Sequence, residues 1–314
     1  MKKAVFLPAL AIVFSAFSIA DEQPLEFEAG YLVDGKPGLQ PSGLAICSGE
    51  IVFVSDKHEQ EIYKLVFHPQ GAAKQGVAEV KTWKTLSSIP APPKQDFSFT
   101  MRFRRFVAEL AGISGGMDWE GIACDRFGNT FLASEYYFSI LKIDASGKME
   151  WLADDLYRSG NKAGLFQKDN AYIEGLTLQD GALLLAAERE PRGIIALDGG
   201  SASFHVQPEP QSSGQDLPLD YTGLEAYNDK IIALERNHYQ VCQLSQQYES
   251  KPCYSFKEVA TSSDWGYNTG KYGLAEGVAV DGSSLWIIVD NNGDTRKADA
   301  DDSRSTILKF KNPF

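Results

Sequence analysis

A glycine-centred motif occurs five times along this chain, and its spacing constrains the fold more than any other feature. In each copy a Ser, Thr or Glu precedes a Gly, an aliphatic residue follows, and a polar turn leads into an apolar stretch that ends in an acid. The copies begin near residues 41, 119, 173, 221 and 275, and their glycines are 78, 54, 48 and 54 residues apart. Such periods, filled with short apolar stretches and Gly or Asn/Asp turns, are typical of β-propeller blades.

We therefore predict an all-β protein, a β-propeller of five four-stranded blades. The first interval exceeds a blade by roughly twenty-five residues, which is too few for another four-stranded sheet, and a degenerate sixth blade is the alternative. Residues 25–29 are expected to form the outer strand of the last blade and to close the ring, which removes exposed sheet edges. The insert over 85–118 has apolar residues at helical spacing near 98–110, which predicts a short basic amphipathic helix over one mouth of the channel.

The same repeat predicts where acidic side chains gather. In an antiparallel hairpin, the start of the first strand and the end of the second strand lie at the same end. The Glu that precedes three of the glycines and the acid 12 to 14 residues after every motif Gly should therefore share one mouth of the central channel. The expected ring consists of Asp56, Glu120, Glu135, Glu174, Glu188, Glu235, Glu276 and Asp290.

Carboxylate oxygens that converge at a rigid mouth are ligands that suit Ca²⁺, which accepts six to eight of them. Carboxylates that lie this close together also repel one another, so they require a neutralising partner at neutral pH. The candidate metal ligands are Asp56, Glu135, Glu188, Glu235 and Asp290. The candidate catalytic residues, as further ligands or as a base, are Glu120, Glu174 and Glu276.

Basic residues offer a second explanation for the ring. Arg102, Arg189 and Arg236 are candidates for binding an anionic substrate, since guanidinium groups pair well with phosphate and carboxylate. However, Lys57, Arg189 and Arg236 directly follow ring acids. They can neutralise these acids, and each Glu before a Gly can accept backbone hydrogen bonds from the next blade, in which case the ring is only structural.

Other site motifs are absent from the sequence. It contains no P-loop, Cys-x-x-Cys or His-Glu-x-x-His motif. The stretch 290–294 (Asp-Asn-Asn-Gly-Asp) resembles the first half of a calcium loop but lacks the terminal Glu, so a solvated turn is the simpler interpretation. With 30 basic against 42 acidic residues and a pI near 4.9, the chain lacks the basic surface of a nucleic-acid-binding protein.

The N-terminal twenty residues have the pattern of a cleaved secretory signal. Lys2 and Lys3 precede an apolar run over 4–19, and residues 18–20 (Ser-Ile-Ala) match the cleavage preference. Cleavage would leave residues 21–314 as one propeller domain, with 28 basic against 42 acidic residues and a charge of −14. We expect a periplasmic or secreted monomer without a further membrane segment.

Export makes the four cysteines candidates for disulfides. Cys242 and Cys253 bracket a polar turn between two strand-like segments, and a turn centred on 247–248 would place them opposite each other. Closing this loop stabilises the fold by about 3 kcal/mol in the chain-entropy model. Cys47 and Cys124 follow their glycines by four and three residues, so a bridge between neighbouring inner strands is a further hypothesis, if the Cα atoms come within ~7 Å.

The ordered motifs resemble those of a known group of proteins. Ser-Gly-Leu, Asp-x-Glu-Gly-Ile, Glu-Gly-Leu, Thr-Gly-Leu and Ala-Glu-Gly-Val follow one another over nearly the whole chain after residue 20. This series resembles the bacterial SdiA-regulated propeller proteins and the related phytase-like family, described as having esterase-like activity of phytase. The chain lacks the Asp-Asp-Pro-Ala-x-Trp motif of true β-propeller phytases.

The resemblance implies an exported propeller that depends on calcium and acts on phosphoesters. We thus expect a metal-dependent hydrolase of phosphate or other esters, with an anionic small molecule as substrate and no organic cofactor. The alternative is a non-catalytic propeller that binds a protein, peptide or glycan of the cell envelope, because a fold alone does not imply chemistry.

Overall fold

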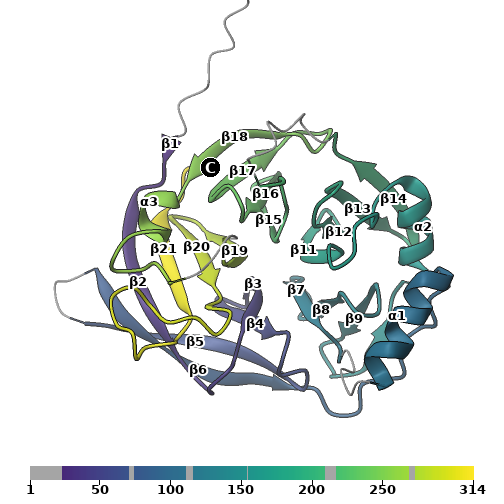
Figure 1. Cartoon of the computed structure of the whole chain (residues 1–314), viewed down its shortest axis with the longest axis horizontal. Coiled ribbons are helices and arrows are strands. Elements are labelled where there is room, and N and C mark those ends of the chain that lie inside the picture. The colour runs from purple at the N-terminus through teal and green to yellow at the C-terminus, as the bar shows by residue number, and fades with distance from the viewer. Residues whose placement is uncertain (1–22, 71–73, 111–115, 154, 209–216, 269–272) are drawn as a thin grey trace, which may run out of the picture.

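Five β-blades stand around a central axis in the computed structural model, which describes residues 23–314 except 71–73, 111–115, 154, 209–216 and 269–272 (Figure 1). In each sheet the first strand of the repeat is innermost, and the chain then runs outward strand by strand. The predicted β-propeller with five blades is therefore confirmed.

Each blade has four main strands. Blade 1 consists of β3 (Pro41–Cys47), β4 (Glu50–Ser55), β5 (Glu61–Pro69) and β6 (Gln75–Thr85). Blade 2 consists of β7 (Trp119–Cys124), β8 (Thr130–Ser134), β9 (Ser139–Ile143) and β10 (Met149–Trp151). Blade 3 consists of β11 (Ile173–Gln179), β12 (Ala182–Ala187), β13 (Gly193–Asp198) and β14 (Ser201–Val206). Blade 4 consists of β15 (Gly223–Tyr227), β16 (Lys230–Glu235), β17 (Gln240–Leu244) and β18 (Ser250–Ser255).

The N-terminal segment completes blade 5 and closes the ring, as predicted. Blade 5 consists of β19 (Ala275–Asp281), β20 (Ser284–Val289), β21 (Thr306–Lys311) and β2 (Phe27–Asp34), which pairs antiparallel with β21. Strand β2 also pairs in parallel with β6, so that blades 5 and 1 form one eight-stranded sheet. A short strand, β1 (Gln23–Pro24), adds to β18 in parallel. The N-terminal segment thus covers sheet edges of three blades.

The five motif glycines lie where the inner strands approach one another at the axis. A Cβ atom on Gly121 would lie 2.7 Å from Cβ of Leu176 in blade 3, and one on Gly277 would lie 2.7 Å from the backbone nitrogen of Leu44 in blade 1. Real Cβ atoms do not come this close to other heavy atoms. The glycines and the aliphatic residues that follow them close the channel at this level, which explains why every repeat has a Gly there.

The predicted helix in the insert exists as α1 (Phe99–Leu110), but it does not lie over the channel. Figure 1 shows it at the periphery, outside β8 and β9. Its buried Met101 belongs to the apolar core between blades 2 and 3, and Arg105 stacks on the rings of Phe97 and Tyr136. The predicted position over the mouth is wrong because α1 finds apolar and aromatic partners at the rim. Two further helices are α2 (Leu156–Ala163) and α3 (Lys257–Ala260).

Both predicted disulfides are present. Cys242 and Cys253 are opposite each other on β17 and β18, with Cα atoms 4.0 Å apart. Cys47 and Cys124 connect β3 of blade 1 to β7 of blade 2, with Cα atoms 5.6 Å apart. The predicted signal sequence, residues 1–20, lies outside the described residues. Within the described part of the chain, no helix is both long and apolar enough to cross a membrane.

Candidate functional site

An acidic hollow occupies one end of the central channel, and residues from all five blades line it. We call this hollow the mouth. Seven of the eight predicted ring acids line it, namely Asp56, Glu120, Glu135, Glu174, Glu188, Glu276 and Asp290. Lys57, Arg189 and Arg236 line it as well.

Three of these acids are directed by irregularities in the inner strands. The pairing between the first two strands skips one residue at Glu120, at Glu174 and at Glu276, each directly before the motif Gly. Such β-bulges redirect the side chain of the unpaired residue, and they are frequent beside active sites. The Gly therefore sets the approach of the strands, while the bulge before it sets the direction of the Glu side chain.

The equivalent positions in blades 1 and 4 carry hydroxyl groups with a different role. Ser42 Oγ donates a hydrogen bond to the carbonyl of Trp119, and Thr222 Oγ1 donates to the carbonyl of Ala275, at 2.5 Å and 2.8 Å. Both bonds connect a blade to one of its neighbours. Both hydroxyls thus connect neighbouring blades, although Ser42, unlike Thr222, also lines the mouth.

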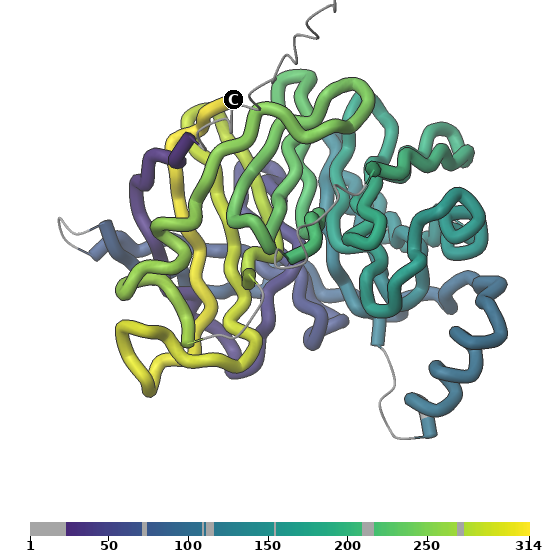
Figure 2. Tube along the Cα trace, turned by 45° about the horizontal axis from the view of Figure 1, so that its top comes forward, coloured from purple at the N-terminus to yellow at the C-terminus, as the bar shows by residue number. Residues whose placement is uncertain are grey.

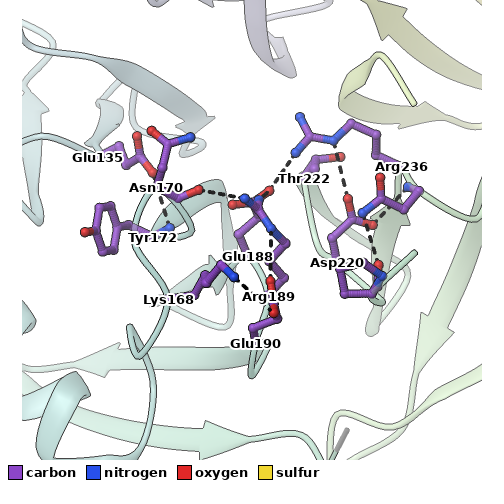
Figure 3. A network of polar contacts seen from close by, with 12 residues as sticks. Glu135, Lys168, Asn170, Tyr172, Glu188, Arg189, Glu190, Asp220, Thr222 and Arg236 are labelled. Atoms are coloured by element: carbon purple, nitrogen blue, oxygen red, sulfur yellow. Dashed lines mark hydrogen bonds and ion pairs between the residues drawn. The ribbon is translucent and has the colours of Figure 1, made fainter. Parts of the chain in front are cut away.

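One side of the mouth is neutralised by arginine. Arg236 Nη1 lies 2.7 Å from both carboxylate oxygens of Glu276, Nη2 lies 2.6 Å from Oε1 of Glu188, and Nε lies 3.3 Å from Oδ2 of Asp220. Arg189 also pairs with Glu188 and donates a 2.9 Å hydrogen bond to the carbonyl of Asn170 (Figure 3). We call these residues the arginine half of the mouth. The structural explanation of the ring fits this half.

The opposite side holds acids that arginine does not neutralise. Asp56, Asp118 and Glu120 each offer an oxygen atom, and these atoms lie within 4.8 Å of one another. Lys57 Nζ contacts Oδ2 of Asp56 at 2.6 Å, whereas Oδ1 of Asp56 is buried without a hydrogen-bond partner among the described residues. Together with Glu135, which shares a hydrogen bond with Asp118, they form the acidic half.

The acidic half is strained electrostatically. Burial raises the pKa of Glu120 and of Glu135 well above the usual range, and the nearby charge of Glu174 raises both further. Burial, followed by the charge of Asp56, raises the pKa of Asp118. Carboxyls so close in a poorly solvated site cannot all ionise by themselves. Some of them keep their protons unless a bound cation compensates the negative charge.

Two further carboxyls titrate near neutrality. Burial raises the pKa of Glu174 to about 8, although the Arg236 guanidinium acts to lower it. Burial and the charge of Glu276 raise the pKa of Asp290 to about 7. Perturbed carboxyls in a hollow of this kind are typical of functional sites, since they can exchange a proton at physiological pH.

Glu235 is the one ring acid that does not line the mouth. Its carboxylate turns toward the interface of blades 3 and 4, where it accepts hydrogen bonds from Arg192 at 2.6 Å, Gln240 at 2.5 Å and Ser250 at 2.6 Å. The expected position at the mouth is wrong for this residue because a buried arginine from the neighbouring blade binds it.

Arg102 does not lie at the mouth either. It is exposed on α1, and the mouth-lining residues include none from that helix. The stretch 290–294 forms a turn, in which the N–H of Asp294 donates to the carbonyl of Asn291 at 2.7 Å. Asp302, which follows this stretch, pairs with Arg296 and Arg304.

Sequence reasoning missed Asp118 and Asp220 as members of the site. Both stand three residues before a motif Gly, in blades 2 and 4. The amides of Glu135, Glu188 and Asp290 bond to the carbonyl at this same position in their own blades, so it is fixed at the mouth. A comparison of this position across the repeats would have found the two aspartates.

Comparison with known proteins does not assign the chain to a family. No family model and no curated protein matches the chain. Among solved structures, it is similar to glutaminyl cyclase from Myxococcus xanthus, with 12% identity, coverage of 92% of this chain and 100% of that one, and a TM-score of 0.49. PQQ-bound aldose sugar dehydrogenase from Streptomyces coelicolor (12%, 91% and 99%, 0.46) and virginiamycin B lyase from Staphylococcus aureus (11%, 88% and 68%, 0.43) are similar as well. We transfer no residue role from them.

Proposed function

We propose that this propeller binds a divalent cation, Ca²⁺ in the first place, in the acidic half of its mouth and hydrolyses a phosphate or other ester there. The observation that carries the proposal is the convergence of Asp56, Asp118 and Glu120, with ligand oxygens within 4.8 Å of one another and without an arginine partner in the described chain. Convergence of three acids beside an open hollow distinguishes an enzymatic mouth from a mouth whose acids are individually paired.

The residues fit a hard cation. All candidate ligands are carboxylate oxygens, and Oδ1 of Asp56 is a buried acceptor that receives no hydrogen bond within the described chain. Glu135 completes the set. Of the ligands predicted from sequence, Asp56 and Glu135 belong to this half, whereas Glu188 is bound by two arginines. The raised pKa values of the acidic half reflect burial and mutual repulsion of its carboxylates. A bound cation is the simplest way to compensate this negative charge.

The chemistry follows from the two halves. When bound, a divalent cation polarises an ester oxygen and lowers the pKa of a coordinated water. Glu174 is affected by charges of both halves, and its pKa of about 8 suits the transfer of a proton at neutral pH. Arg189 and Arg236 would stabilise negative charge on the substrate. Two candidate catalytic residues remain. Glu120 would act as a ligand, and Glu276 would orient Arg236.

Two features support an exported enzyme related to the phytase-like and SdiA-regulated propellers. The order of the five motifs resembles these families. The two disulfides suit an oxidising compartment, the periplasm or the exterior, in agreement with the signal-like pattern of residues 1–20.

The proposal is tested by calcium titration calorimetry and by turnover of p-nitrophenyl phosphate and p-nitrophenyl acetate, with and without chelator. We expect Asp118→Asn to weaken calcium binding at least about tenfold, because it removes a ligand charge. The matched control, Asp301→Asn, removes an exposed acid outside the mouth and should bind as the wild type does.

Glu174→Gln separates binding from catalysis. It should retain calcium binding and lower turnover on the order of a hundredfold, the usual effect of losing a general acid or base. Calcium binding without turnover on any ester would favour the binding platform over the hydrolase. Absence of both calcium binding and turnover in the wild type would refute the proposal.

A further inference from the structure

Helix α1 presents an apolar face to solvent. Phe99, Phe103, Phe106, Val107 and Leu110 are 77%, 58%, 56%, 46% and 73% exposed. In the described chain, only two other large apolar side chains are similarly exposed. Their spacing places the five residues along one side of a helix, so they form a single apolar stripe.

The opposite side of α1 is already held by the propeller. Met101 is buried between blades 2 and 3, and the Arg105 guanidinium lies 4.0 Å from the ring centroid of Phe97 and 3.8 Å from that of Tyr136. Arg105 also donates a hydrogen bond to the carbonyl of Tyr136. The apolar stripe is therefore a surface that the fold presents outward, and Figure 2 shows α1 standing out at the edge of the molecule.

The charge of α1 differs from that of the rest of the chain. The helix contains three Arg and one Glu, whereas the whole chain has a net charge of −12. Arg102 and Arg104 are both exposed next to the apolar stripe, and Arg104 pairs with Asp169. An apolar stripe with aromatic residues, flanked by arginine on a projecting helix, is typical of helices that lie in the interface of a membrane.

We propose that α1 docks this propeller on the surface of an anionic lipid bilayer. The phenylalanines enter the boundary between headgroups and acyl chains, and Arg102 and Arg104 contact lipid phosphates. The negative charge of the whole protein does not prevent this, since charges beyond about 8 Å are largely screened at physiological ionic strength. Because Arg105 binds Tyr136, the neighbour of Glu135, docking through α1 holds the mouth near the lipid surface.

Vesicle sedimentation tests the proposal. The test protein begins at residue 21, since the apolar run over 4–19 would itself bind lipid and the described fold starts at Gln23. Vesicles contain equal parts of phosphatidylglycerol and phosphatidylcholine, or phosphatidylcholine alone. EDTA is present, so that no divalent cation can bridge the acidic mouth and lipid phosphate.

We expect sedimentation with the anionic vesicles and much less with the neutral ones. Phe103→Ser with Phe106→Ser should weaken binding at least about tenfold, since two aromatic rings no longer leave water. The control, Phe127→Ser, replaces a ring that is 68% exposed in a turn of blade 2 and should bind as the wild type does. Arg102→Gln should reduce the preference for anionic lipid.

Three results would overturn the proposal. They are failure of the wild type to sediment with anionic vesicles, equal sedimentation of the double variant with an unchanged melting temperature, and a concentration-dependent dimer that the double variant loses while vesicle binding is absent. The last result would assign the apolar stripe to a second copy of the chain. Because EDTA removes the divalent cation that the proposed hydrolase requires, sedimentation in this assay is independent of the proposed activity.

Discussion

Arg236 binds acids from three successive blades, Glu188 of blade 3, Asp220 of blade 4 and Glu276 of blade 5. Its side chain is 15% exposed, and those of the three acids are between 0% and 11% exposed. Burial alone would lower the pKa of Arg236, but the surrounding carboxylates raise it, so the guanidinium remains charged. Loss of one member of such a buried network leaves uncompensated charges.

We expect Arg236→Met to lower the free energy of unfolding by about 3–5 kcal/mol, because three buried carboxyls lose their common partner. Urea denaturation at pH 8 measures this loss. Arg304→Met is the matched control: Arg304 pairs with Asp302 but is 41% exposed, and the loss should stay below about 1 kcal/mol. Adding Glu276→Gln to Arg236→Met should restore part of the stability. Equal stability of the two arginine variants would contradict a neutralising role for Arg236.

At the scale of residues, the sequence predicted positions better than partners. The hairpin argument located seven of eight ring acids at the mouth, because strand direction alone decides at which end a residue lies. It failed for Glu235, whose carboxylate binds Arg192, the residue directly before β13 of blade 3. Which acids are paired also depends on contacts between blades, and the repeat itself does not encode these.

At the scale of elements, the inner strands carry the most stringent requirement. Their glycines allow backbones of neighbouring blades to meet at the axis, and a Cβ on Gly277 would lie 2.7 Å from the nitrogen of Leu44 and 2.8 Å from its Cβ. Backbone atoms held in two neighbouring blades cannot give way as a flexible side chain can. The Gly of the sequence repeat is thus explained by the packing of the inner strands at the axis.

Gly277→Ala should therefore destabilise the protein by about 1–3 kcal/mol through overpacking at the axis. Gly282→Ala, in the turn after the same strand, is the matched control, since a Cβ there meets no atom within 4 Å. Its effect should remain within about 0.5 kcal/mol. Chemical denaturation of both variants provides the comparison, and a Gly277→Ala protein as stable as Gly282→Ala would show that the ring can expand.

The order of the strands could be predicted from the sequence, whereas the contacts of helix α1 could not. Strand order followed from the repeat, because each period must bury one sheet against its neighbours. For α1, periodicity predicted the helix and its apolar residues but not what they contact. Only the structure shows that Met101 is buried while Phe103 remains in solvent.

At the scale of the whole molecule, the acids include two groups whose titration changes stability in opposite directions. Glu61, bonded by Lys36 and Tyr63, has a pKa lowered to about 2, and the hydrogen bonds of Asp302 to Arg304 lower its pKa to about 2 as well. Their ionised forms are favoured by folding, so this stability is present above the ordinary carboxyl pKa and is lost as the pH falls toward 2.

The mouth behaves in the opposite way. Glu174 and Asp290 have pKa values raised to about 8 and about 7. Between the ordinary carboxyl pKa and these values, the folded protein holds protons that the unfolded chain has released, so stability falls as the pH rises through that window. In EDTA, we therefore expect the melting temperature to be highest at about pH 4–5 and to decrease as the pH rises toward about 8.

Calcium should change this profile, because a bound cation replaces the protons that compensate the mouth. Calorimetry from pH 4 to 9, with EDTA or with calcium, should show little stabilisation by calcium at about pH 5 and the largest stabilisation at about pH 9. Glu174→Gln, which cannot ionise, should reduce the decrease in EDTA, by up to about 1.4 kcal/mol per pH unit for one group. A melting temperature in EDTA that is constant from pH 5 to 9 would show that the mouth is fully neutralised by its own arginines, with no charge left for a cation to compensate.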